Sequence, residues 1–537
     1  MVHATRIMPN STLDYGTIPC NATVGASAVV SDDCETERDL LRKDTDTHSA
    51  LPLLQTCTII LSLSGAAFCT SMTSGLLTVC LPGIAVDLMI PEHLLLWPSS
   101  AYSLACGCCL LLAGSIADKV GDKSINLIGT ATVAIAVLAN GRARDGIELI
   151  MFRAVQGLGA AMSLPTGVSI IARSLTPGRR RNIGFACLGV AQPLGYSIGL
   201  IMGGIVQEAG NWRLGYYVCA PIIAAFVVAA WASIPPNKHQ SVRANLPNLI
   251  TEIDWVGIAM LSTGFGLLSY TSAVMTRDAT LLMPILNIVA MLAGLLLIIA
   301  SPKWMSRQVR LGRPALIPNS IWANRAFAAI SLTVFLAWAS LQSSELLASL
   351  FFQRVQLISP LEASIKLLPN VLTGFIVNLF TGLTVQYFAS YKLMAVASVV
   401  ATVSPVIMAV INPAWSYWVA ACWAVALAPI SIDVLFTIAH IVITDVFPAD
   451  MHALAGGVFN TVSQLGTSLG MSLVTVVSNA VINASEVPDK ESPEALMTGY
   501  RAAFWTCAAM MLLSAGSSFG LRELGKLGGG HARSASQ

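Results

Sequence analysis

Charged residues are scarce in this chain. Only 11% of its 537 residues are charged, whereas 55% are hydrophobic. A soluble domain carries about 25% charged residues, so this chain lacks the charge to cover a water-facing surface of its size. The composition predicts a protein that crosses the lipid bilayer several times. No basic tract with interleaved aromatic residues occurs, so we expect no nucleic-acid partner.

Several missing sequence motifs argue against other classes of protein. The sequence contains no G-x-x-x-x-G-K-[ST] motif, which argues against an ATP-driven pump. No nucleophile and base stand at a supporting spacing, so we expect no enzyme. The "CGCC" at 106–109 has no histidine or carboxylate close by, and most of the twelve cysteines lie in apolar runs. We therefore expect no metal site and no cofactor.

Long apolar segments are abundant. About 20 apolar residues span a bilayer as a helix, and the sequence offers fourteen candidates. They lie near residues 57–81, 97–117, 124–140, 147–172, 183–206, 212–234, 254–274, 281–301, 326–350, 363–385, 391–411, 416–441, 454–479 and 500–520. The predicted fold is all-helical, and the even number places both termini on one side.

The distribution of lysine and arginine predicts the orientation. With a cytosolic N-terminus, sixteen basic residues lie in the inner loops and the C-terminal tail, not counting the N-terminal tail and Arg325 at a span border, and seven lie on the outer side. This bias agrees with the positive-inside rule. The sequon Asn483-Ala484-Ser485 then lies in the longest outer loop, so Asn483 is a predicted glycosylation site. Residues 1–50 hold no apolar run, which favours a disordered cytosolic tail over a signal peptide.

The chain repeats itself weakly. The second span ends in "GSIADKVGDK" and the tenth in "GLTVQYFASYK". Two similar halves are typical of secondary transporters, with a substrate site near the midplane. The predicted parts, in chain order, are a cytosolic tail (1–54), a six-helix bundle (55–234), a linker with two extra spans (235–325), a second six-helix bundle (326–521) and a cytosolic tail (522–537).

The stretch "GSIADKVGDK" resembles the loop between spans two and three of the major facilitator superfamily. Gly114, Asp118 and Gly121 match that pattern, and Asp122 replaces a basic residue. The resemblance implies a gate, in which the glycines allow a tight turn and close approach and Asp118 pairs in one conformation only. The alternative is an ordinary solvated loop.

In "RAVQGLGAA", Arg153, Gln156, Gly157 and Gly159 match the fourth-span pattern of the superfamily. The resemblance associates Arg153 with transport and proton coupling. A charge within a span is costly, by roughly 2.5–3.5 kcal/mol at a helix centre, and needs a reason. The alternative is an arginine at the span boundary that snorkels to the interface.

The fifth span resembles the antiporter motif of drug:proton exporters. Gly195, Gly199 and Gly203 recur every four residues, so they form one smooth helix face. Pro193 adds a local bend, and Gln192 stands where the motif has glycine. A plain packing face is compatible with the functional interpretation.

"FNTVSQLGTSLG" resembles a thirteenth-span pattern of the fourteen-span drug:proton antiporters, and "TPGRRRNIGFA" and "DWVGIAM" resemble their fungal branch. The matched residues of the thirteenth span are Asn460, Gln464, Gly466 and Gly470. The resemblance implies a major facilitator fold of two six-helix bundles with two extra spans.

One departure concerns the coupling carboxylate. Bacterial members usually carry an aspartate in the first span, and Thr73 occupies that position here. Asp433 lies near mid-span, where burial favours the protonated form and suits proton binding; the alternative is a structural hydrogen bond. Glu345 is nearer the outer end, where a wetted mouth residue is the favoured interpretation. Candidate residues for lining an amphipathic pocket are Tyr102, Trp338, Gln342 and Asn378, and the alternative for each is a packing residue.

These observations predict a monomeric secondary transporter that exports a small organic molecule, a drug, toxin or secondary metabolite, in exchange for protons. One alternative is an exporter of an organic acid such as a dicarboxylate, with Arg153 as counter-ion of the substrate. Another is a non-transporting receptor on the same fold. We expect the plasma membrane first and the vacuolar membrane second.

Overall fold

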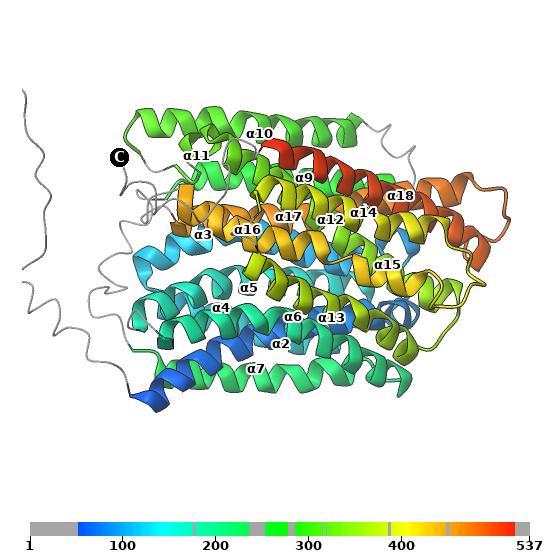
Figure 1. The fold of residues 1–537 in the computed structure, drawn as a ribbon, viewed down its shortest axis with the longest axis horizontal. Helices are drawn as coiled ribbons and strands as arrows, with labels where there is room; N and C mark the ends of the chain where they lie inside the picture. The colour runs from blue at the N-terminus through cyan, green and yellow to red at the C-terminus, as the bar shows by residue number, and fades with distance from the viewer. Residues whose placement is uncertain are drawn as a thin grey trace, which may run out of the picture. The chain divides into compact units, whose positions relative to one another are not determined.

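The computed structural model describes residues 52–175, 179–235, 253–277, 285–313, 315–317, 319–384, 388–446 and 452–520, and these residues are almost entirely helical (Figure 1). The long helices, in chain order, are α2 (Leu53–Asp87), α3 (Trp97–Val120), α4 (Asp122–Arg142), α5 (Gly146–Ser174), α6 (Arg179–Glu208), α7 (Arg213–Ser233), α9 (Trp255–Arg277), α10 (Ile285–Arg310), α12 (Arg325–Leu350), α13 (Pro360–Thr384), α14 (Ser390–Val410), α16 (Ile430–Val446), α17 (His452–Ala484) and α18 (Pro493–Ser517). Shorter elements are η1 (Glu92–Leu94), α11 (Asn319–Ala323), η3 (Phe351–Val355) and α15 (Ala421–Leu427).

Twelve helical segments in the described ranges are long and apolar enough to cross a membrane. Two further long helices, α9 with 23 residues and α13 with 25, are not among these twelve. The multi-span, all-helical prediction is therefore confirmed, whereas the count of fourteen spans stays a prediction.

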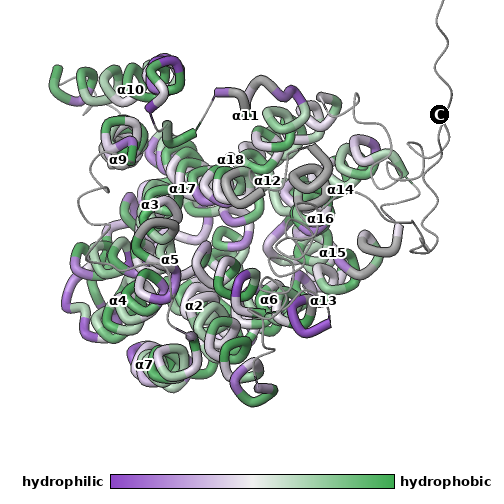
Figure 2. Tube along the Cα trace, turned by 90° about the vertical axis from the view of Figure 1, so that its left-hand side faces the viewer, coloured by the Kyte–Doolittle hydropathy of each residue, from purple (hydrophilic) through white to green (hydrophobic). Residues whose placement is uncertain are grey.

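The helices form two sets that pack in the same pattern. In the first set, α2 packs on α6 and α7, and α4 packs on α5 and α7. In the second set, α12 packs on α17 and α18, and α14 packs on α16 and α18. The sets meet along two seams, α3 against α17 and α6 against α13 (Figures 1 and 2). The site described below lies between these seams.

The pair α9 and α10 packs against this arrangement beside α3 and α17 (Figure 2). The hydroxyl of Ser262 on α9 donates to the carbonyl of Cys108 on α3 over 3.4 Å. Asp254 fixes the start of the pair, because its carboxylate accepts from the Gly257 amide at 2.8 Å and the Trp304 indole at 2.9 Å. This aspartate therefore caps α9 and ties it to α10.

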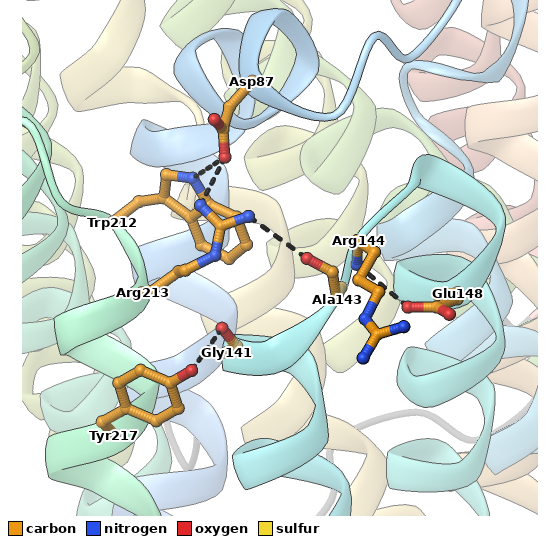
Figure 3. Close-up of polar contacts among 8 residues, drawn as sticks. All are labelled: Asp87, Gly141, Ala143, Arg144, Glu148, Trp212, Arg213 and Tyr217. Atoms are coloured by element: carbon orange, nitrogen blue, oxygen red, sulfur yellow. Dashed lines mark hydrogen bonds and ion pairs between the residues drawn. The ribbon is translucent and has the colours of Figure 1, made fainter.

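We call the end of the bundle at which α2 stops the Asp87 end and the opposite end the Leu53 end. At the Asp87 end, Arg213 at the start of α7 pairs with Asp87 and donates to the Ala143 carbonyl at 3.2 Å (Figure 3). The Trp212 indole donates to the same carboxylate at 3.1 Å. These bonds tie the ends of α2, α4 and α7 together, so the first set is held as a unit at this end.

The two sets are also joined at the Asp87 end. Pro82 lies inside α2 and has no N–H, so the Thr78 carbonyl one turn earlier lacks its helical donor. The hydroxyl of Ser349 on α12 donates to this carbonyl at 2.7 Å, and Gln353 donates to the adjacent Val79 carbonyl at 2.9 Å. We call these two bonds the α12–α2 clasp. An ion pair between Arg354 and Glu92 lies at the same end.

The predicted span 416–441 is confirmed in part, since Ala421–Ala439 is one of the twelve segments, but its helix is interrupted. The apolar segment 416–441 is not one continuous helix but two, α15 and α16, separated at Ala428 and Pro429. Pro429 interrupts the helix because it cannot donate a backbone hydrogen bond and its ring clashes with the preceding turn.

Candidate functional site

A cavity of about 160 Å³ lies between the two sets of helices. Its walls come from α2, α3, α5 and α6 of the first set and from α12 and α17 of the second. Hydroxyls line one wall, with Thr70, Ser74 and Thr78 one helical turn apart on α2. Amide and aromatic side chains also line the cavity, namely Gln192, Gln342, Gln464, Tyr102, Tyr196 and Trp338. The cavity can therefore form many hydrogen bonds and also offers flat apolar surfaces.

Arg153 lies in the wall of this cavity and is only 1% exposed. Its Nε donates to the Pro98 carbonyl at 3.2 Å, and its Nη1 donates to Oε1 of Gln156 at 2.9 Å. The guanidinium lies over the Tyr102 ring, with Cζ 4.8 Å from the ring centroid. Arg153 therefore does not snorkel to the interface, because its side chain points into the protein.

Gln156 extends this network to two other helices. Its Nε2 donates to the Thr73 hydroxyl on α2 at 2.8 Å. Its Oε1 also accepts from Asn140 on α4 at 2.9 Å. Thr73, Asn140 and Gln156 are all fully buried. The arginine is thus held by residues of α2, α3, α4 and α5, all of which belong to the first set.

Glu345 on α12 is in a different position. Its carboxylate accepts hydrogen bonds from Asn370 on α13 and from the Tyr196 hydroxyl on α6. Tyr196 in turn lies 3.3 Å from the Thr78 hydroxyl and lines the cavity. Glu345 is partly buried, and its interpretation as a wetted mouth residue stays a prediction. It connects three helices across the boundary between the two sets.

Asp433 on α16 does not line the cavity. Its Oδ1 accepts from Asn378 on α13 at 2.7 Å, whereas its buried Oδ2 has no hydrogen-bond partner in the described part of the chain. Gly374 leaves room for that oxygen, since a Cβ there would lie 2.8 Å from it. The expected structural hydrogen bond is thus present, and Asn378 lies with Asp433 rather than with the cavity.

The predicted glycine faces lie where helices meet closely. A Cβ on Gly195, Gly199 or Gly203 of α6 would meet the backbone of α2, at the carbonyls of Phe68, Met72 and Leu76. On α17, a Cβ on Gly466 or Gly470 would meet α12 at Phe335 or Ala339. These contacts explain why α2–α6 and α12–α17 approach so closely. Pro193 lies inside α6, and its carbonyl accepts from Ser197 at 2.6 Å.

The predicted gate lies at the Leu53 end, between α3 and α4. Gly121 has φ 112°, a conformation that favours glycine. Gly114 has open space around its Cβ position, so close helix approach does not explain it. The side chain of Asp118 is outside the described residues. Asp122 is buried, accepts from Ser169 at 2.8 Å and pairs with Arg173 at 3.2 Å.

Two other predicted residues lie away from the cavity. Asn460 is exposed and donates to the Gly456 carbonyl of its own helix at 3.0 Å. Asn483 is exposed at the C-terminal end of α17. Sequence reasoning missed Gln192 and Tyr196 as lining residues. It also missed the α2 hydroxyls, although the spacing of four between residues 70, 74 and 78 is a detectable signal.

Comparisons with known proteins agree with this geometry. The Major Facilitator Superfamily profile matches residues 63–471. MFS-type transporter 1 of Pyricularia oryzae is 36% identical over 528 residues, which cover 90% of this chain and 86% of the relative. Efflux pump terJ of Aspergillus terreus is 25% identical over 419 residues, 76% of each chain. The crystal structure of the peptide transporter POT with sulfate aligns with a TM-score of 0.62 at 16% identity, covering 87% of this chain and 96% of that one.

The profile match and the Pyricularia relative cover most of the chain, and the aligned solved structure shares its fold. The molecule is therefore a multi-pass membrane transporter and not an enzyme, and the chain belongs to the major facilitator superfamily.

Proposed function

We propose that this transporter exports a small organic molecule, a drug, toxin or secondary metabolite, in exchange for protons. The observation that carries the proposal is the polar cavity between the two sets of helices, with Glu345 hydrogen-bonded across their boundary. One of the fungal relatives is an efflux pump, which favours export as the direction of transport. With the span-thirteen sequence, the fungal relatives also favour the fungal branch of the fourteen-span drug:proton antiporters.

Glu345 is our first candidate for proton coupling. A carboxylate that accepts from Tyr196 and Asn370 loses acceptor capacity when it binds a proton. Because Tyr196 also lines the cavity, protonation of Glu345 changes the bonds between the cavity wall and α13. Asp433 is the second candidate, since one of its oxygens is buried without a donor and a protonated carboxyl group tolerates that position better.

The membrane arrangement completes the proposal. We place α9 and α13 across the bilayer as the two spans beyond the twelve, and we place the N-terminus in the cytosol because of the basic inner loops. The Asp87 end is then the outer side, so the α12–α2 clasp closes the outer side of the cavity. Gly114, Asp118 and Gly121 form the gate at the cytosolic side. We expect a monomer in the plasma membrane, with Asn483 outside.

Metabolite profiling of culture medium tests export directly. Cells without the gene should lose at least one compound from the medium and accumulate it inside, and the wild-type gene should restore the secretion. A proton ionophore should abolish the secretion in the restored cells without lowering the amount of transporter. An unchanged medium would contradict export, and secretion that resists the ionophore would contradict proton coupling.

A further inference from the structure

The charge of Arg153 has no counter-charge in the described part of the chain. Arg153 is 1% exposed and takes part in none of the ion pairs of the described residues. The ionisable side chains that surround it are the phenols Tyr102 and Tyr216, which are neutral at physiological pH. A buried cation without an anion is destabilising unless something compensates it.

The hydrogen bonds of Arg153 do not supply that compensation. Its acceptors in the described part of the chain are the neutral oxygens of Pro98 and Gln156. The chain of bonds continues from Gln156 to the Thr73 hydroxyl and from there to the Thr70 carbonyl, and both of these groups are also neutral. In the described residues, no protein acceptor bonds its Nη2. Because Arg153 lines the cavity, a ligand in the cavity can accept from this side of the guanidinium.

The rest of the cavity wall also favours an acceptor ligand. Its described lining contains amides and hydroxyls but no aspartate or glutamate. Glu345 stays behind the wall, where Tyr196 and Asn370 hold its carboxylate. A cationic ligand would therefore meet Arg153 without a neutralising partner, whereas an anionic ligand would complete an ion pair in a desolvated site.

We propose that the cavity binds a small organic anion whose acidic group pairs with Arg153. This substrate class rests on the export function proposed above. The body of the ligand is flat and apolar, because Tyr102, Tyr196 and Trp338 offer ring surfaces. A cavity of about 150 Å³ holds one benzene molecule, so this cavity of about 160 Å³ suits one ring with a carboxylate.

Three probes of nearly equal shape test the proposal: benzoate, benzamide and benzamidine, which carry negative, zero and positive charge. Binding to the purified full-length transporter is measured by isothermal titration calorimetry. We expect benzoate to bind about tenfold more tightly than benzamide, because hydrogen bonds to charged groups contribute more than neutral ones, and benzamidine to bind least. Equal binding of the three probes, preference for benzamidine, or no binding of benzoate would each overturn the proposal.

Substitution of Arg153 tests whether this residue causes the preference for benzoate over benzamide. In Arg153→Gln, benzoate and benzamide should bind equally, whereas Arg153→Lys should keep part of the preference because it keeps the charge. Arg501→Gln is the matched control, because Arg501 is exposed and donates to the Ile411 carbonyl away from the cavity. If Arg153→Gln folds and still prefers benzoate, the anion binds elsewhere. If it does not fold, the probe series on the wild-type protein decides alone.

The two proposals fail in different ways. If the secreted compound is a cation and benzamidine binds best, export stands and the anion site is wrong. If benzoate binds but the medium is unchanged by loss of the gene, the anion site stands and export is wrong.

Discussion

Arg153 lines the cavity, whereas Glu345 contacts the lining residue Tyr196 from behind, and the two side chains are held in different ways. Within the described residues, Arg153 bonds only to the first set of helices, and the network continues through Gln156 within that set. Glu345 belongs to α12 of the second set, yet it accepts from Tyr196 on α6 and Asn370 on α13. The position of Arg153 is therefore independent of how the two sets lie, whereas the bonds of Glu345 depend on it. This difference suits Arg153 for binding and Glu345 for coupling.

The largest expected effect comes from Glu345→Gln, which removes the proton acceptor and nearly keeps the volume. Accumulation of substrate against its gradient should fall by about 100-fold, within the usual range for coupling between two sites. Exchange of labelled for unlabelled substrate across vesicles should continue, because the cavity and Arg153 are intact. Transport assays in proteoliposomes with and without a pH gradient measure both quantities.

Glu362→Gln is the control for this experiment, since Glu362 is an exposed carboxylate that pairs with Lys366 one turn away. Asp433→Asn should have a smaller effect than Glu345→Gln, because Asp433 does not contact the cavity. Full proton-driven accumulation by Glu345→Gln would move the coupling role to Asp433, and Glu345 would then have no transport role that distinguishes it from Arg153.

The next effect in size is expected for Arg153→Lys. Lysine keeps the charge but cannot donate to Pro98 and Gln156 at once while facing the cavity, because its ammonium is a point charge on a flexible stem. Transport should fall about tenfold, the loss of one charge-assisted hydrogen bond. The amount of folded transporter should be unchanged, as measured by size-exclusion chromatography of the solubilised protein. Normal transport by this variant would show that the guanidinium geometry is dispensable.

The smallest effect on transport is expected for a substitution in the close glycine contact between α2 and α6. Gly199→Ala places a methyl group against the Met72 carbonyl, and overpacking of this kind costs about 1–3 kcal/mol. The thermal unfolding midpoint should drop while substrate affinity holds.

Gly189→Ala is a control on the same helix. The Cβ position of Gly189 has open space, so alanine should stabilise the helix by about 0.5–1 kcal/mol. Equal destabilisation by both variants would mean that the glycines act through helix propensity and not through contact with α2.

Twelve of the spans were predictable from the sequence because apolar length is a local property. The glycine face of α6 was also predictable, since residues 195, 199 and 203 repeat at about the period of a helix turn. The partner of that face was not, because only the fold places Phe68 and Met72 against it. In the same way, Arg153 was a candidate from its span, whereas its missing counter-charge depends on which residues surround it in space.

Glu345 shows the limit of local reasoning. Its position near the end of a span suggested a solvated mouth, but its partners could not be predicted locally, because Asn370 lies on the next long helix and Tyr196 lies on α6, far away in the chain. The break between α15 and α16 was missed in the prediction for another reason. The apolar run through Pro429 is continuous in hydropathy, so only the backbone chemistry of proline marks the interruption.

Pro82 gives the α12–α2 clasp a role in the energetics of hydration. The Thr78 carbonyl has no helical donor, so its partner is either Ser349 of the second set or a water molecule. When the sets part at the Asp87 end, this carbonyl must bind water instead, since a bare carbonyl in a dry environment costs several kcal/mol. Separation of the helices is therefore coupled to entry of water at the Asp87 end. Loss of this water favours the arrangement in which the helices are in contact.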